Sequence, residues 1–98
     1  NLWHRVAANV SHDWSVPELA KEAYMSEGHF HREVQRLFGE KPMQIVCRLR
    51  MERAAALLKT TSLDLAAIAR QIGYSTPYTF SNAFLREMGT RPGKYRRR

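Results

Sequence analysis

Two groups of polar side chains in this sequence have the chemistry needed to read nucleic-acid bases. The first group holds Arg32, Gln35 and Arg36, and the second holds Asn82 and Arg86. On a helix that enters the major groove of DNA, arginine pairs with guanine through two hydrogen bonds, and asparagine or glutamine pairs with adenine. The elements that carry these side chains decide whether they meet a partner or are ordinary solvated residues.

The other reactive side chains do not form a recognisable catalytic or metal site. His29 and His31 are two residues apart and diverge on a helix, and Cys47 has no cysteine or histidine at a ligand spacing. A single cysteine on a mostly apolar helix is more simply a small core residue than a nucleophile. We therefore expect no enzymatic activity, no metal and no cofactor.

Length, charge and cysteine content restrict the class of protein. The 98 residues fit one domain or two very small ones, and no apolar stretch approaches the roughly 20 residues of a membrane span. Residues 1–42 carry five basic and six acidic side chains, whereas residues 43–98 carry eleven basic and three acidic ones. A basic surplus in one half suits a polyanionic partner, either nucleic acid or an anionic membrane surface. A single cysteine and the absence of a signal peptide favour a cytoplasmic module, which we expect to be part of a longer protein.

Apolar periodicity predicts helices throughout the chain. Leu2, Val6 and Val10 fall on one helix face and predict a first helix that ends near residues 12–14. The segment 42–59 is apolar around almost its whole circumference, which indicates a helix covered on more than one side. The other predicted helical ranges are 16–23, 27–38, 65–72, 77–88 and 92–95.

Capping hydroxyls mark the starts of four of these helices. Ser15 forms a capping box with Glu18, and Ser26, Ser62 and Thr76 are the other capping residues. Because helix N-termini bind anions, these four positions are candidate phosphate contacts, with further contacts from basic residues of the second half.

The two halves of the chain repeat each other. Phe30, Val34, Phe38, Gly39 and Pro42 recur fifty residues later as Phe80, Phe84, Met88, Gly89 and Pro92. These positions preserve the apolar face and the glycine end of a helix, so we interpret the repeat as a duplication. The prediction is two helix-turn-helix units, residues 1–41 and 60–98, joined by a rigid helix over 42–59.

The second helix of each unit should present its outer side chains to a partner. Helical periodicity directs Gly28, Arg32, Gln35 and Arg36 outward in the first unit and places His31 on the flank. In the second unit the corresponding outward residues are Tyr78, Asn82, Leu85 and Arg86. Ser81 lies on the flank, with Thr79 beside them. On a lone amphipathic helix this would be read as a solvated face, but a duplicated helix-turn-helix in a basic chain favours contact with DNA.

The second half also carries a specific motif. It reads Ile68-Ala69-x-x-Ile72-Gly73-Tyr74-Ser75, then Tyr78-x-Phe80-x-x-x-Phe84, then Met88-Gly89-x-x-Pro92-x-x-Tyr95-Arg96. This pattern closely resembles the signature of the AraC/XylS family of bacterial transcription regulators, although Val34 stands where the family generally has phenylalanine.

The resemblance implies an all-α fold of seven helices that binds two successive major-groove segments of promoter DNA. It places base contacts at Gly28, His31 and Arg32 in the first unit. In the second unit it places them at Pro77, Tyr78, Thr79 and Asn82. Lys94 and Arg96 are expected to contact phosphates.

The resemblance also implies partners beyond DNA. It indicates a transcription activator that contacts RNA polymerase subunits and carries a separate N-terminal effector and dimerisation domain. Two other classes stay open. In one, the near-neutral first unit docks a protein and only the second unit binds DNA. In the other, the basic tail binds a membrane surface or single-stranded RNA.

Overall fold

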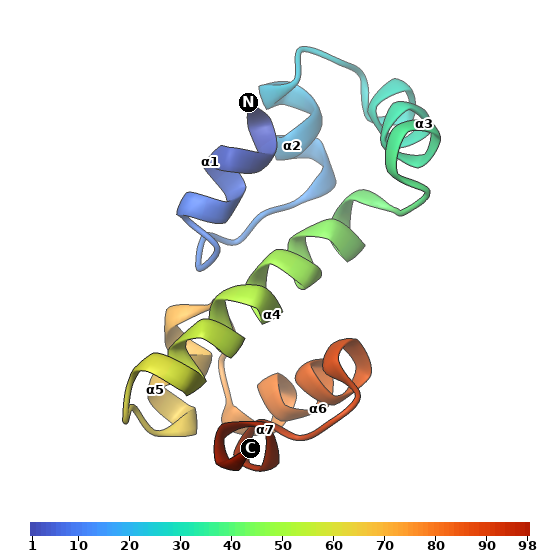
Figure 1. The fold of residues 1–98 in the computed structure, drawn as a ribbon. Helices are drawn as coiled ribbons and strands as arrows, with labels where there is room; N and C mark the ends of the chain where they lie inside the picture. The colour runs from blue at the N-terminus through green and yellow to red at the C-terminus, as the bar shows by residue number, and fades with distance from the viewer.

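The computed structural model describes residues 1–98 as seven helices without a strand, as expected (Figure 1). They are α1 Leu2–Ala8, α2 Val16–Glu22, α3 Glu27–Phe38, α4 Pro42–Thr60, α5 Leu65–Gln71, α6 Pro77–Met88 and α7 Pro92–Arg97. The long helix α4 runs diagonally between α1–α3 at one end and α5–α7 at the other (Figure 1). The molecule measures 42 × 22 × 21 Å along its principal axes. None of its helices has both the length and the apolar character needed to cross a membrane.

Local capping sets the boundaries of the two helices that matter most for function. The hydroxyls of Ser26 and Thr76 accept hydrogen bonds from the amides three residues later, at 3.2 and 3.1 Å. Gly39 and Gly89 end α3 and α6 in the left-handed region, with φ of 68° and 78°. Glycine adopts this region without strain, so the same signal ends both helices and the predicted boundaries are confirmed.

The predicted end of the first helix is wrong. α1 ends at Ala8 instead of near residues 12–14. Val10 leaves the helix and is buried, only 6% exposed, in the core formed with the second unit. The Trp14 indole N–H donates to the Asn9 carbonyl at 2.9 Å, which closes the turn. A tertiary contact of Val10 therefore replaces the last turn that the apolar spacing predicted.

Two predicted capping arrangements also differ. The Ser15 hydroxyl accepts from the Glu18 amide at 3.4 Å, but the Glu18 carboxylate lies 2.7 Å from His12 Nε2 and does not return to Ser15. The capping box at α2 is thus only half formed. Asp64, not Ser62, caps α5, because its carboxylate accepts the amide three residues later at 2.8 Å.

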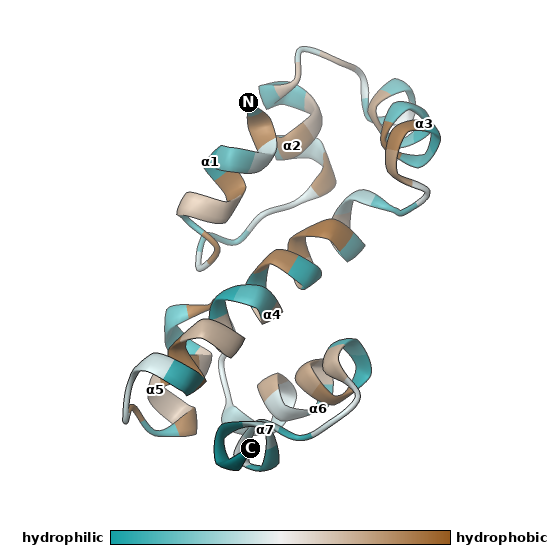
Figure 2. Cartoon of the chain, viewed as in Figure 1, coloured by the Kyte–Doolittle hydropathy of each residue, from teal (hydrophilic) through white to brown (hydrophobic).

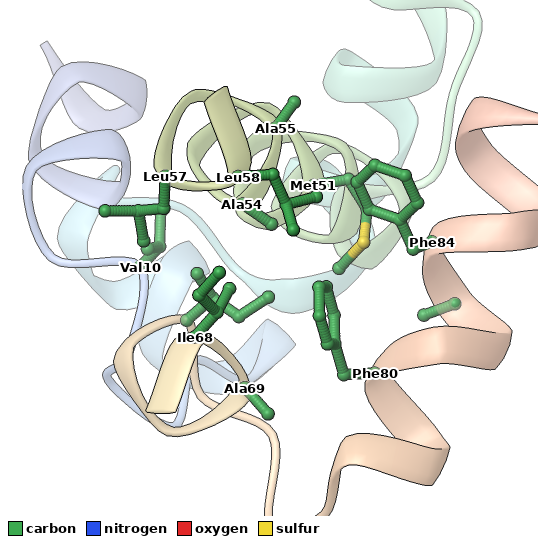
Figure 3. Packing of buried hydrophobic residues seen from close by; sticks show 12 residues of the cluster. Val10, Met51, Ala54, Ala55, Leu57, Leu58, Ile68, Ala69, Phe80 and Phe84 are labelled. Carbon is green, nitrogen blue, oxygen red and sulfur yellow. The ribbon is translucent and has the colours of Figure 1, made fainter. Parts of the chain in front are cut away.

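Two hydrophobic cores lie at the two ends of α4. The first core contains Val6, Trp14, Leu19, Ala20, Phe30, Val34, Ile45 and Val46. The second is larger and contains Phe80 and Phe84, which point from α6 toward Met51 of α4 (Figure 3). Because α4 contributes residues to both cores, the expectation that it is covered on more than one side is confirmed.

The internal repeat is visible in the packing. Phe30 and Phe80 are both buried, and Pro42 and Pro92 are both fully buried at the start of the following helix. Phe38 is the exception, since it is 49% exposed. The duplicated positions therefore perform the same structural task in each unit, apart from this one.

Arg50 of α4 ties the two units together. Its Nε donates to the Val10 carbonyl at 2.9 Å and its Nη2 to the His12 carbonyl at 2.8 Å. The same guanidinium lies 5.8 Å from the centre of the Tyr74 ring, in the turn between α5 and α6. One side chain thus joins the α1–α2 loop, the connecting helix and the second helix-turn-helix turn.

Candidate nucleic-acid interface

In Figure 1, α3 lies beyond one end of α4 and α6 lies beside the other half of α4, both toward the right of the view. The C-terminal ends of α3 and α6 border one shallow cleft of about 500 Å³ across α4. Its lining residues are Gly39, Glu40, Met43, Gln44, Cys47, Arg86 and Glu87. Because α4 is a single helix packed into both cores, this arrangement holds the two helices in a fixed relation.

The outer face of α3 is polar and accessible. Gly28, Arg32, Gln35 and Arg36 are exposed, and His31 is half-buried. Figure 2 shows hydrophilic residues over much of α3. The sequence-predicted residues of the first unit therefore share one surface.

Gly28 makes room for Arg32. A Cβ added at Gly28 would lie 3.3 Å from Arg32 Nη1, so the guanidinium folds back toward the start of α3. This is tighter than most Cβ contacts, and a side chain at position 28 would push Arg32 aside. Gly28 thus affects the surface through the position of Arg32.

Arg36 is paired within α3. Its Nε and Nη2 donate to the two carboxylate oxygens of Glu33 at 3.1 and 2.8 Å. These hydrogen bonds lower the pKa of the Glu33 carboxyl and favour its charged form. Glu33 therefore offsets the positive charge of Arg36 on this surface.

The outer face of α6 is more varied. Tyr78 is 75% exposed and Pro77 is exposed at the first helical position. Thr79 is exposed, but its hydroxyl donates to the Thr76 carbonyl at 3.1 Å. The tyrosine ring is thus the most exposed large apolar group on α6, while the threonine hydroxyl already has a partner in the cap.

Asn82 has a partner that the sequence did not indicate. Arg91, at the start of α7, donates from Nη1 to Asn82 Oδ1 at 2.9 Å and to Ser81 Oγ at 3.0 Å. The contact spans the turn between α6 and α7, so helical periodicity gives no signal for it. Arg91 therefore joins the candidate surface. Arg86, on the same helix α6 as Asn82, is also exposed.

The basic C-terminal residues are not equivalent. Lys94 is exposed, whereas Arg96 donates to the carbonyls of Leu58 and Thr61 at 3.1 and 3.3 Å. These carbonyls lie at the end of α4, where backbone acceptors lack intrahelical donors. Arg96 therefore caps the C-terminal end of α4 with its Nε and Nη2 donors.

Comparison with known proteins gives consistent matches to one family. Residues 19–98 match the family model described as "Helix-turn-helix domain". The chain is 36% identical over 87 residues to the "RCS-specific HTH-type transcriptional activator RclR" of Escherichia coli, covering 89% of this chain and 31% of that protein. It is 37% identical over 87 residues to a "Putative AraC-like transcription regulator" of Streptomyces antibioticus, covering 89% and 29%. The chain thus spans about a third of the length of these relatives.

Solved structures agree with this match. The C-terminal domain of AraT, a response regulator from Geobacillus stearothermophilus, superposes with a TM-score of 0.90 at 31% identity, covering 98% of this chain and 80% of that one. The DNA-binding domain of AdpA, a global transcriptional factor crystallised with a target DNA, superposes with a TM-score of 0.91 at 28% identity, covering 98% and 86%. This chain belongs to the AraC family of helix-turn-helix transcription regulators.

Proposed function

We propose that residues 1–98 bind duplex DNA sequence-specifically by placing α3 and α6 in two successive major-groove segments. The observation that carries the proposal is that the C-terminal ends of α3 and α6 border one cleft across α4 and that each helix has accessible polar side chains. The similar AdpA domain was crystallised with a target DNA, which supports the same class of ligand. Residues 1–41 and 60–98 would each read one segment, and 42–59 would set their separation.

The dimensions of the molecule support this mode of binding. Successive major-groove segments on one face of B-DNA are about 34 Å apart, and the long axis of the molecule is 42 Å. Recognition helices held closer than one turn would require the DNA to bend, at a cost of a few kcal/mol.

Each surface residue has a role that follows from its chemistry. Arg32 and Gln35 would hydrogen-bond to base edges from α3, with His31 beside them and Arg36 released from Glu33 by the DNA. From α6, Tyr78, Thr79, Asn82 and Arg86 would face the bases, and Tyr78 offers an apolar ring for a thymine methyl group.

Phosphates would be held mainly by backbone and basic groups. The free amides at the starts of α3 and α6, next to Ser26 and Thr76, point out of the helix ends and attract anions. Lys94 would add a cation, and Pro77 would allow a close approach of the backbone to the DNA. These contacts set the register but carry no sequence information.

The whole protein would act as a transcription regulator in the bacterial cytoplasm. RclR is described as a transcriptional activator, which supports an activating role. In that role the protein would contact RNA polymerase subunits. The relatives are about three times as long as this chain, which supports a further effector-binding and dimerisation domain.

Selection of bound sites from random duplex DNA tests the proposal. Residues 1–98 should enrich a motif of two boxes about one helical turn apart. Enrichment of a single box would instead support the version in which only the second unit binds DNA and the first docks a protein. Absence of any enrichment over scrambled duplex would overturn sequence-specific binding.

A further inference from the structure

Arg91 lies outside α3 and α6, the two helices that carry the predicted base-contacting residues. It nevertheless forms a hydrogen bond with one of those residues, Asn82. Its Nη1 donates to Asn82 Oδ1 at 2.9 Å and also to Ser81 Oγ at 3.0 Å. Arg91 itself is exposed, while Ser81 and Asn82 are half-buried. The guanidinium therefore sits at the edge of the α6 surface and holds two adjacent side chains of that helix.

The chemistry of arginine fixes the orientation of the Asn82 amide. An asparagine side chain ends in a carbonyl oxygen and an NH2 group that can exchange places by a half rotation. A guanidinium has only donors, so the amide end that faces Arg91 must be the oxygen. The NH2 group of Asn82 is thereby directed away from Arg91, with its two N–H donors available.

We propose that Arg91 is a positioning residue that sets Asn82 as a hydrogen-bond donor toward the N7 atom of a purine. This inference rests on the proposed function, because it assigns a specific role within the α6 surface. N7 is an acceptor in both adenine and guanine at the major-groove edge, so the held amide selects purine over pyrimidine at one position. Without Arg91 the amide can turn its oxygen outward, and an acceptor facing N7 is repelled.

The experiment uses a selected duplex in which each purine in turn is replaced by 7-deazapurine, which lacks the N7 acceptor. In the unmodified protein, one replacement should weaken binding roughly three- to tenfold, the value of one hydrogen bond, and Asn82→Ala should abolish that loss. Arg91→Met keeps most of the side-chain length but has no donor. In Arg91→Met, replacing the same purine by 7-deazapurine should weaken binding only about twofold or less. The effects of replacing other purines should be unchanged.

Two further variants separate positioning from simple charge. Arg91→Lys keeps the positive charge and a donor on a flexible stem, and it should restore part of the N7 dependence. The double variant Asn82→Ala with Arg91→Met should bind no more weakly at that position than Asn82→Ala alone, because both remove the same interaction.

A phosphate contact by Arg91 would give a different result and would overturn the proposal. Arg91→Met would then weaken binding to every duplex by a similar factor and reduce the slope of log affinity against log salt by about one. The loss of affinity caused by the 7-deazapurine replacement would stay the same. The proposal also fails if no purine N7 depends on Asn82 while the duplex is still bound specifically. Loss of all specific binding in the unmodified protein would instead contradict the proposed function.

Discussion

Replacing Arg50 by methionine should loosen the joint between the two helix-turn-helix units. The substitution keeps an unbranched apolar stem but removes the donors to the Val10 and His12 carbonyls, which lie 2.9 and 2.8 Å away. It also removes the guanidinium that lies 5.8 Å from the centre of the Tyr74 ring. All three lost contacts reach residues outside α4.

The magnitude follows from these contacts. A hydrogen bond from a charged donor contributes about 1.5–3 kcal/mol, and an arginine over an aromatic ring contributes about 0.5–1 kcal/mol at an accessible site. Arg50 is half-buried and part of this surface is in water, so we expect the unfolding free energy to fall by about 2–3 kcal/mol.

Urea unfolding with two probes measures both the loss and the loosening. Trp3 and Trp14 are the only tryptophans and both lie in the first unit, so their fluorescence reports that unit alone. Far-UV circular dichroism reports all seven helices. In Arg50→Met the fluorescence transition should move to lower urea than the dichroism transition, whereas the two should coincide in the unmodified protein.

Arg53→Met is the matched control, because Arg53 is an exposed arginine on the same helix and forms no ion pair or side-chain hydrogen bond. It should change the unfolding free energy by less than about 0.5 kcal/mol. If Arg50→Met were as mild as Arg53→Met, with both probes still coincident, Arg50 would not tie the two units together.

Three further predictions concern the surface and the core. Arg32→Ala should reduce the binding free energy on the selected site by about 1–3 kcal/mol and relax the sequence preference at one base pair. Lys94→Ala should instead weaken binding to all duplexes alike. Equal losses of affinity on selected and scrambled DNA for Arg32→Ala would contradict base reading. Glu33→Gln should free Arg36 from its ion pair and raise the DNA affinity roughly two- to tenfold in titrations at low salt, with a steeper dependence of the affinity on salt. Unchanged affinity would show that the ion pair does not compete with DNA. Burial and the nearby Cys47 thiol raise the pKa of Tyr74 from 10.0 to about 12. Between these two pH values the folded state keeps a neutral phenol that the unfolded chain ionises, so the free energy of unfolding should fall as the pH rises from 10 to 12. Urea unfolding should show a larger fall in the unmodified protein than in Tyr74→Phe. Identical pH profiles of the two proteins would refute this prediction.

The elements of the fold could be predicted because their signals are local. The caps at Ser26 and Thr76 and the glycines 39 and 89 act over three or four residues, so the bounds of α3 and α6 follow from the sequence. The fifty-residue repeat adds a second, independent copy of each signal. Burial of Phe30 and Phe80 follows from the same periodicity.

The features that could not be predicted depend on residues far apart in the chain. α1 ends early because Val10 joins a core built mostly from residues 51–84. Arg96 caps carbonyls more than thirty residues earlier, and Arg50 reaches back about forty residues. A side chain on a predicted face can thus be engaged by a tertiary partner, as Arg96 is, and a contact such as Arg91 with Asn82 leaves no periodic trace.

The central claim is that α4 holds α3 and α6 so that both enter one face of the same duplex. Insertion of half a helical turn, about five base pairs, between the two boxes of a selected site moves the second box to the opposite face of the DNA. We predict that the affinity for this duplex falls to that of a site with one box, and that insertion of a full turn does not restore it, because α4 is rigid. Unchanged affinity after the half-turn insertion would contradict the claim, since it would mean that the two helices do not read the duplex as one fixed pair.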